Sequence, residues 1–374
     1  MKKTLIALTL ATLPVAASAD VVLYGVIKGG VEVTRSFTSN IGDKGTSTKI
    51  VDYGSRIGFK GHEDLNNNLR AIWQLEQDVN IGGGNTGFST RDSFIGLTGN
   101  FGTVKAGHLS TPVKDINGRL DQWEYDNNAA GLGIYTRTNA AVDRKVAASY
   151  ETPNFAGFQA QAYVSPSDNN NNNNNSSFVS NNTNSPTDRE AAVYGAKLGY
   201  ENAGFFADVA GTYVKNSVTN AAGQGKDGYQ AAANVGFENS NWLAGVGYQQ
   251  SRYVDDVESF TGEPGTALGV NEIVKGSKEV VASAAYTINN AVRLKGSAAY
   301  GFDIKSLPTV GITPATATAP VLNDAKYVQG VVGADYLLSK RTALNGQVGY
   351  LELKDGNKNK YKKGAVGVGM SHKF

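Results

Sequence analysis

The side chains that most often carry catalysis are scarce in this sequence. Its only histidines are His62, His108 and His372, and it has no cysteine. His108 lies two residues before Ser110, but nothing in this strand-like neighbourhood turns the two side chains toward each other or supplies an orienting acid. A Ser–His hydrolase is therefore a weak alternative, and three scattered histidines do not predict a zinc site.

Two further motifs resemble ligand sites but are better explained as loops. Residues 82–87 match the glycine pattern of nucleotide-binding proteins, yet a strand rather than a helix follows them, so no helix N-terminus is available for a pyrophosphate. Asp255, Asp256 and Glu258 could attract a divalent cation, but we expect the solvated acidic face of a loop. The sequence thus predicts no enzyme activity, no cofactor and no metal.

Composition and charge exclude several classes of protein. The chain has 374 residues, of which 40% are hydrophobic and 18% charged, so wholesale disorder is not expected. Mean hydropathy is −0.30, and no apolar run of transmembrane-helix length follows the first twenty residues, which excludes a helical membrane protein. Without Lys2 and Lys3, 33 basic residues balance 33 acidic ones, so we expect no nucleic-acid partner.

The N-terminus has the three parts of a secretory signal peptide. A short positive start precedes an apolar stretch at residues 4–15, and residues 17–19 are small, as signal peptidase requires. We expect residues 1–19 to be removed by cleavage near Ala19, so that residues 20–374 form a single domain outside the cytoplasm.

The rest of the chain shows a period of two. Between Leu23 and Val33, one set of alternate residues is apolar or small, whereas the other set carries Lys28 and Glu32. Because alternate residues of a strand face opposite sides, this pattern predicts strands with one apolar and one polar face. A soluble β-sandwich would bury the apolar face, whereas a membrane β-barrel would turn it toward lipid.

Three features favour the membrane barrel. The segments run about ten residues, the length of a tilted strand that crosses a membrane. Tyr and Trp gather near the segment ends, as in aromatic girdles, and short connections alternate with long polar ones. We therefore predict an all-β fold, a 16-stranded antiparallel transmembrane β-barrel with long outer loops. The predicted strands are 21–33, 53–62, 69–80, 91–99, 101–109, 144–151, 158–165, 190–201, 205–215, 228–238, 242–253, 277–288, 292–303, 326–338, 342–353 and 363–374.

The longest connection, residues 110–143, is the best candidate for a functional segment, because such long loops in compact folds are usually functional or disordered. A barrel of this size encloses a water-filled lumen, which this connection would narrow if it folded inward. It also carries the acids Asp115, Asp121, Glu124 and Asp126. The apolar residues that could anchor it are Leu120, Trp123, Tyr125, Leu132, Ile134 and Tyr135.

Strand parity assigns a set of basic residues to the inner wall. On the lipid face near mid-membrane each would cost about 2–4 kcal/mol. Acids that face bases across a narrow aqueous gap would orient dipolar solutes and filter ions by charge. Ordinary surface ion pairs are the alternative explanation. The wall residues are Lys28, Arg56, Lys60, Arg70 and Lys105, with Lys145 as a further candidate.

Several stretches together resemble the Neisseria-type general porins of Gram-negative bacteria. They are DVVLYGVIKGGVEV, SRIGFKGHEDL, AIWQLEQDV, RDSFIGLTGNFGTVKAGHL, YETPNFAGF and the ending VGVGMSHKF. The resemblance implies a trimeric sixteen-stranded barrel in the outer membrane, with the third long loop folded inward as a constriction. It matches Asp115, Asp121 and Glu124 to the acidic positions of that loop. It matches four bases to the first wall strands, namely Lys28, Arg56, Lys60 and Arg70.

The sequence departs from the family pattern at three places. These are the run of asparagines at residues 169–175, and Thr98 and His108, where relatives often carry basic residues. Fewer basic residues on the wall would weaken a preference for anions, so the sequence leaves the ion selectivity open.

The expected function is a general diffusion porin that passes ions and small hydrophilic solutes through a water-filled channel. The expected partners are two further copies of the chain in a homotrimer, outer-membrane lipid and lipopolysaccharide. The barrel-assembly machinery is a further expected partner, because the terminal strand ends on Phe374 in the manner of its recognition signal. Two alternatives stay open, a channel specific for one solute and a surface-exposed adhesin or host-interaction barrel.

Overall fold

The computed structural model describes most of the chain beyond the N-terminal leader. The described residues are 20–37, 45–66, 68–83, 90–123, 130–137, 143–166, 192–219, 225–256, 260, 273–306, 322–356 and 360–374. Several features named above lie outside them, namely the leader 1–19, the end of the glycine-rich run, Glu124, Tyr125, Asp126, the asparagines at 169–175 and Glu258.

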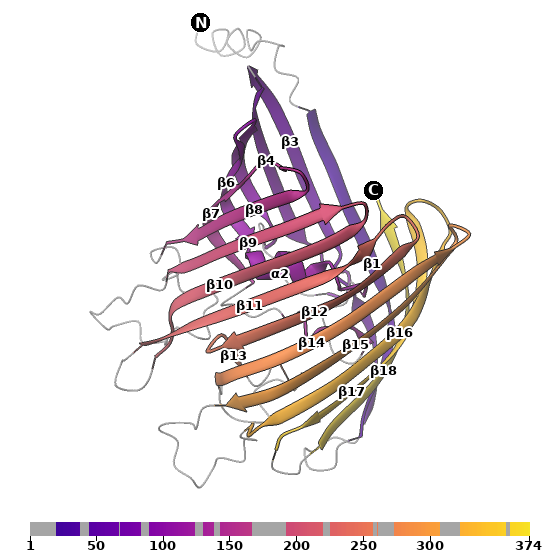
Figure 1. Ribbon diagram of the computed structural model, residues 1–374. Coiled ribbons are helices and arrows are strands. Elements are labelled where there is room, and N and C mark those ends of the chain that lie inside the picture. Colours follow the sequence, from indigo (N-terminus) through magenta and orange to yellow (C-terminus); the bar gives the residue numbers. More distant parts are fainter. Residues whose placement is uncertain are drawn as a thin grey trace, which may run out of the picture.

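Almost all the described structure is β-strand (Figure 1). The first nine segments are β1 (Asp20–Ser36), β2 (Thr46–Asp52), β3 (Arg56–Asn66), β4 (Leu69–Asp78), β5 (Ser93–Gly99), β6 (Gly102–Ser110), β7 (Arg144–Glu151), β8 (Phe158–Ser165) and β9 (Val193–Asn202). The others are β10 (Phe205–Thr219), β11 (Gly225–Glu238), β12 (Trp242–Arg252), β13 (Asp255–Asp256), β14 (Ile273–Ile288), β15 (Val292–Ser306), β16 (Ala325–Leu337), β17 (Thr342–Lys354) and β18 (Lys360–Lys373). The helix α2 (Pro112–Gly118) follows β6.

The strands close into a barrel. Each pairs antiparallel with its neighbours along the chain, and β1 pairs with β18, for example Val31 with Val368. Both β2 and β3 pair with β1, and both β12 and β13 pair with β14, so each of these couples forms one interrupted barrel strand. The 18 segments therefore make sixteen barrel strands, which confirms the predicted architecture.

One strand boundary departs clearly from the prediction. The second barrel strand begins at Thr46 rather than at residue 53. Residues 53–55 interrupt its pairing, and Gly54 has a φ of 86°, outside the range of a strand. This break shifts the alternation of inward-facing and outward-facing residues. The segment before the break, TSTKIVD, is mostly polar, so its sequence shows no period of two that would predict a strand.

The two faces of the barrel differ as the alternation predicted. Apolar side chains such as Val246 and Val332 are more than half exposed on the outside, whereas Gln249 and Gln329 from the same strands are buried on the inside. Aromatic side chains pair beside the short turns, as Trp242 does with Tyr286 at 4.2 Å between ring centroids. Among the described residues, no helix is long and apolar enough to span a membrane.

The short turns place tight demands on the backbone. Gly102 follows the turn between β5 and β6 with a φ of 106°, and a Cβ there would lie 2.2 Å from the carbonyl oxygen of Glu151. Only glycine fits this position. At the same end of the barrel the terminal residue Phe374 exchanges backbone hydrogen bonds with Gly25, which joins the C-terminus to β1.

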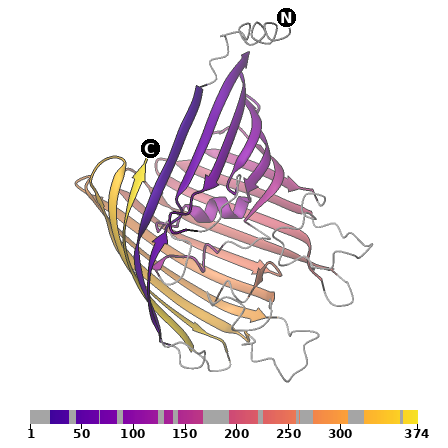
Figure 2. The ribbon, with the colours of Figure 1, turned by 180° about the vertical axis from the view of Figure 1, so that it is seen from behind.

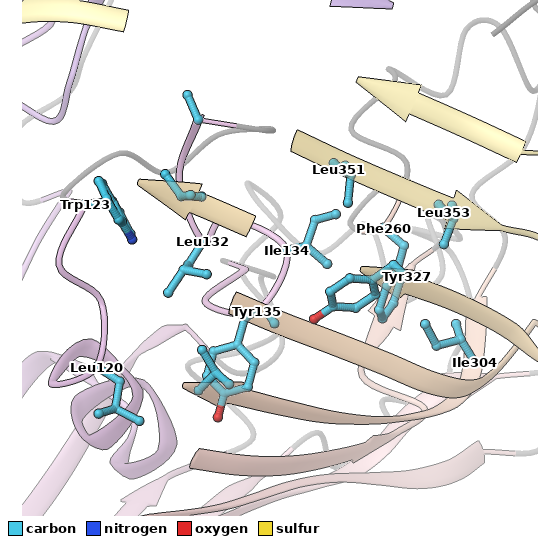
Figure 3. Packing of buried hydrophobic residues seen from close by; sticks show 14 of the residues in the cluster. Leu120, Trp123, Leu132, Ile134, Tyr135, Phe260, Ile304, Tyr327, Leu351 and Leu353 are labelled. Atoms are coloured by element: carbon cyan, nitrogen blue, oxygen red, sulfur yellow. The ribbon is translucent and has the colours of Figure 1, made fainter. Parts of the chain in front are cut away.

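The main cluster of buried apolar side chains joins the connection after β6 to the strands of the barrel (Figure 3). Leu120, Trp123, Leu132 and Tyr135, all from the long connection after β6, are at most 1% exposed. They pack with side chains of the wall such as Tyr327. The prediction that apolar residues anchor this connection is confirmed for those that the structure describes.

The outer face yields a test of the barrel's orientation toward lipid. Val332 lies midway along β16, whereas Leu338 lies at the turn after it, and both are more than half exposed. We expect Val332→Arg to lower the free energy of unfolding from lipid vesicles by about 2–4 kcal/mol and Leu338→Arg by at most about 1 kcal/mol. Urea titrations of both variants provide the measurement, and equal losses would contradict a lipid-facing band centred on Val332.

Candidate functional site

The helix α2 starts the segment that enters the barrel. Pro112 suits the first helical position, and Val113 and Ile116 pack against Ala210 and Ala232 of the inner wall. Figure 2 shows α2 enclosed by the ring of strands. The described part of this segment, residues 111–123 and 130–137, is called the lumen segment below.

Amide side chains of the wall bind the backbone of the lumen segment. A chain that leaves the regular sheet must find partners for its carbonyl groups when it is buried. Four wall residues on β11, β12, β16 and β17 donate Nδ2 or Nε2 hydrogen bonds to such carbonyls. They are Asn234 to Ile116 at 2.7 Å, Gln249 to Tyr135 at 2.7 Å, Gln329 to Gly131 at 2.5 Å and Gln347 to Ala130 at 2.5 Å.

Trp123 attaches the middle of the segment to β15 and β16. Its Nε1 donates to the Oγ of Ser297 at 2.9 Å, and the Nζ of Lys295 lies 5.0 Å from its ring centroid. A Cβ at position 333 would lie 2.9 Å from the indole ring. Gly333, which has no side chain, therefore leaves space on the wall for the indole to pack. The side chain is fully buried.

Arg137 attaches the far end of the segment through a buried ion-pair network. Its Nε and Nη2 donate to the two oxygens of Asp255 at 2.9 and 2.7 Å, and its Nη1 donates to Glu279 at 2.7 Å. The hydroxyl of Tyr327 donates to the same Glu279 carboxylate, and the guanidinium lies 4.4 Å from the ring centroid of Phe260. Although burial acts to lower it, the two carboxylates hold the pKa of Arg137 well above its usual value.

This network corrects one interpretation of the sequence. Asp255 is fully buried against Arg137 and is not part of a solvated acidic face. The two residues lie 118 positions apart, and no local pattern links them. The side chains of Asp256 and Glu258 lie outside the described residues.

The structure places the predicted loop acids in different surroundings. Asp115 lies 3.9 Å from the Nζ of Lys197, and burial by the surrounding protein raises its pKa to about 6, against the opposing effect of Lys197. Its side chain keeps 36% of its surface accessible, as expected for a group surrounded by protein but open to an aqueous lumen. Asp121 accepts hydrogen bonds from the backbone N–H of Trp123 and the hydroxyl of Thr136, so it stabilises the segment's own turn.

The predicted wall bases lie on strands β1, β3, β4 and β6, next to outward-facing apolar residues. Lys28 is buried, whereas Arg70 is exposed and forms an ion pair with Asp64 at 2.6 Å beside a short turn. The Nζ atoms of Lys60 and Lys105 lie 5.1 and 4.9 Å from the ring centroids of Tyr24 and Phe94. Arg56 begins β3. Their role in selectivity stays a prediction.

Sequence reasoning missed several charged residues of the interior. Each pairs with acids that are distant in sequence, so only the three-dimensional arrangement reveals them. They are Arg91 with Glu76 and Asp78, Arg119 with Glu201, Asp208 and Glu238, Arg144 with Asp92, and Lys197 with Asp115 and Glu151.

The histidines do not come together. The Nδ1 of His108 contacts the carbonyl oxygen of Arg91 at 3.3 Å, and the Nδ1 of His372 contacts the hydroxyl of Thr342 at 2.9 Å. Within the described ranges, no three His, Cys, Asp or Glu side chains converge to hold a metal ion.

A closed barrel of sixteen antiparallel strands, apolar outside and polar inside, defines a membrane channel of the porin class. The family described as Gram-negative porin matches residues 4–356. The major outer membrane protein P.IB of Neisseria sicca is 39% identical over 392 aligned residues, which cover 100% of both chains.

Two solved structures share the fold. The anion-selective porin from Comamonas acidovorans has a TM-score of 0.69 and 21% identity, over 96% of this chain and 100% of that one. OmpT of Vibrio cholerae, in a trimer form, has a TM-score of 0.60 and 14% identity, over 95% of this chain and 99% of that one.

The chain belongs to the Gram-negative porin family. It is a diffusion channel of the outer membrane, as the sequence predicted.

The two arginines of the lumen segment provide a matched comparison. Arg137→Met would leave Asp255 and Glu279 buried without their cation, so we expect the free energy of unfolding to fall by about 3–5 kcal/mol. Arg119→Met breaks ion pairs with the partly exposed Glu201 and Glu238, and we expect a loss of about 1 kcal/mol or less. Urea titration measures both, and equal stability of the two variants would contradict the anchoring role of Arg137.

Proposed function

We propose that the channel is a general diffusion pore narrowed by the lumen segment, with a preference for anions set by basic side chains on the facing wall. The observation that carries this proposal is the hydrogen bonding of the segment's carbonyl groups to wall amides on β11, β12, β16 and β17. A segment held in this way occupies part of the bore and leaves the remainder to water and solutes.

The contacts of the lumen segment support a channel opening that lies on the side of the barrel away from the strands that the segment contacts. The helix α2 contacts β9, β10 and β11, and the rest of the described segment bonds to β12 and β14 through β17. By strand parity we assign the five predicted wall bases to the inner faces of β1, β3, β4 and β6. We therefore infer that solutes pass between the lumen segment and this part of the wall.

The pairing of charges inside the lumen favours anions. The acids Glu76, Asp78, Asp92 and Glu151 all have a basic partner, Asp115 lies beside Lys197, and Asp121 is bound within the segment. Among the described residues, Lys60 and Lys105 form no ion pair with a carboxylate and lie against aromatic rings instead. Their positive charge therefore acts on the water-filled gap.

Assembly follows the family resemblance. We propose that residues 1–19 are removed, that residues 20–374 form one barrel domain, and that three copies associate through their outer faces in contact with lipid and lipopolysaccharide. The trimer form of OmpT supports a trimer by analogy. The pairing of Phe374 with Gly25 at the barrel seam is compatible with recognition of the C-terminus by the assembly machinery.

Two alternatives predict different behaviour. A solute-specific channel would show saturable flux, whereas a general pore shows flux that rises linearly with concentration. An adhesin barrel would conduct little and would bind its partner through the outer loops.

Ion preference can be tested by neutralising the wall. A unit charge about 8 Å from an ion in water changes the ion's energy by about 0.5 kcal/mol, which is about twofold in local concentration. Each lysine raises the local concentration of anions and lowers that of cations about twofold, so we expect Lys60→Gln with Lys105→Gln to lower the anion-to-cation permeability ratio about sixteenfold. Arg70→Gln, whose ion pair with Asp64 already balances its charge, serves as the control and should change the ratio much less. Reversal potentials under a salt gradient measure the permeability ratio. An equal effect of the double variant and the control would show that the two lysines do not set the selectivity of the pore.

Acidity should strengthen the preference for anions. Above pH 6 Asp115 is mostly ionised and adds a negative charge to the lumen, and it becomes neutral as the pH falls through about 6. We expect the anion-to-cation permeability ratio to rise about fourfold between pH 7.5 and pH 4.5, by the same Coulomb estimate for both ions.

The variant Asp115→Asn provides the control for this prediction. It should hold the ratio near its acidic value throughout the pH range. If the permeability ratio of this variant rose by the same factor between pH 7.5 and pH 4.5, the pH dependence would belong to another group.

A further inference from the structure

Three lysines lie side by side on the outer face of the barrel. Lys326 of β16 is directly opposite Lys354 of β17, and Lys354 is directly opposite Lys360 of β18. All three are exposed, whereas the neighbouring Tyr327 and Leu353 belong to the buried apolar cluster. Like charges at directly opposite positions destabilise a sheet, because their Cβ atoms lie only about 4.5–5.5 Å apart. A bound anion would therefore stabilise this lysine row.

The protein itself supplies little negative charge to the lysine row. Among the described residues, neither Lys326 nor Lys360 forms an ion pair with a carboxylate. Lys354 has a partner in Glu352 at 3.4 Å, but the same carboxylate also lies 3.4 Å from a second lysine. The nearby Asp355 is fully buried and is not exposed with the row. The row therefore keeps a surplus of positive charge.

The lysine row lies at the outer end of the barrel. A short turn at residues 338–341 joins β16 to β17 at the opposite end, whereas the long connection of residues 307–324 precedes β16 at this end. Long connections lie on the outer side of outer-membrane barrels. The rings of Tyr300 and Phe302 stack at 5.7 Å between centroids just below the row, as in an interfacial girdle. The lysines therefore lie at the level of the head groups of the outer leaflet.

The outer surface below the row is hollowed. The hollow has a volume of about 580 Å³ and lies over β14 to β17. Gly330 and Tyr350 line it, and each is four residues, about 13 Å along its strand, from a lysine of the row. A Cβ at Gly330 would meet no atom within 4 Å, so packing within the barrel does not require glycine there. The small residues that form the hollow are Ala282, Ala284, Gly296, Ala298 and Gly330.

We propose that the lysine row and the hollow together bind one molecule of lipopolysaccharide, with a phosphate group on the lysines and an acyl chain in the hollow. Ammonium groups bind phosphate as point charges. An acyl chain that leaves the head group at the row reaches the hollow along the same strands. This site rests on the proposed contact between the barrel and lipopolysaccharide and specifies its place. It does not depend on the bases assigned to the pore.

Lipid A, the phosphorylated and acylated part of lipopolysaccharide, is the probe for this site. Native mass spectrometry of the folded full chain in a zwitterionic detergent measures its dissociation constant. We expect Lys326→Gln with Lys360→Gln to weaken binding about 25-fold, at about fivefold for each lysine near an anionic lipid. This double variant relieves repulsion within the row, so we expect it to fold.

Lys340→Gln with Lys373→Gln provides the matched control for charge. These two lysines are exposed at the opposite end of the barrel, beside the turn at residues 338–341. The control removes the same charge from the protein, and we expect it to change lipid A binding by less than about twofold.

Gly330→Leu tests the hollow separately from the charges. The leucine side chain fills the space assigned to the acyl chain, and we expect it to weaken lipid A binding about threefold through lost packing contacts. Gly211→Leu is the control, because a Cβ at Gly211 of β10 also meets no atom within 4 Å but lies outside the hollow. It should leave binding unchanged.

Three results would overturn the proposal, and they differ in what else they affect. Wild-type protein that binds no lipid A would also remove the proposed contact with lipopolysaccharide. Binding that the two double variants weaken equally, or that neither weakens, would keep lipopolysaccharide as a partner but place it elsewhere on the barrel. Equal binding by Gly330→Leu and the wild type would show that no acyl chain occupies the hollow.

Discussion

A peptide segment placed inside a barrel must find hydrogen-bond partners for its own carbonyl groups, and the interior of this protein is organised by that constraint. Asn234, Gln249, Gln329 and Gln347 supply the donors from four different strands. Arg137 adds a charged attachment at the end of the segment, where two buried carboxylates require a cation. The same polar residues that keep the inner wall compatible with water therefore determine where the segment lies.

This arrangement divides the inner wall into two parts with different tasks. Polar side chains of β11, β12 and β14 to β17 hold the lumen segment, and the acids Asp255 and Glu279 are neutralised there by Arg137. The strands β1 to β6 face the remaining space, and there Lys60 and Lys105 pack on aromatic rings rather than on acids. Packing on a ring orients an ammonium group without cancelling its charge, so these lysines can act on passing ions. Selectivity in this account follows from which charges the fold leaves uncompensated.

The sequence was most informative where one physical rule acts on every residue. The contrast between lipid and water imposes a period of two on each strand, so sixteen strands could be predicted. The segment TSTKIVD before Gly54 was not predicted as a strand because it is polar. The apolar residues Leu120, Trp123 and Tyr135 marked the long connection as a packed one. Pairing between distant charges leaves no such local signal. Arg137 and Asp255 are separated by 118 positions, and Asp255 was misread as solvated for this reason.

We infer that the lumen is open to water, narrowed on one side by the lumen segment and lined by positive charge on the other. Single-channel recording of the purified protein in a planar bilayer, with the reversal potential under a salt gradient, tests it most directly. We expect long-lived conductance steps that close in three equal levels. We also expect the reversal potential to have the sign of a channel that passes anions more readily than cations. Folded, inserted protein that gives no steps, or a reversal potential of the opposite sign at neutral pH, would contradict this inference.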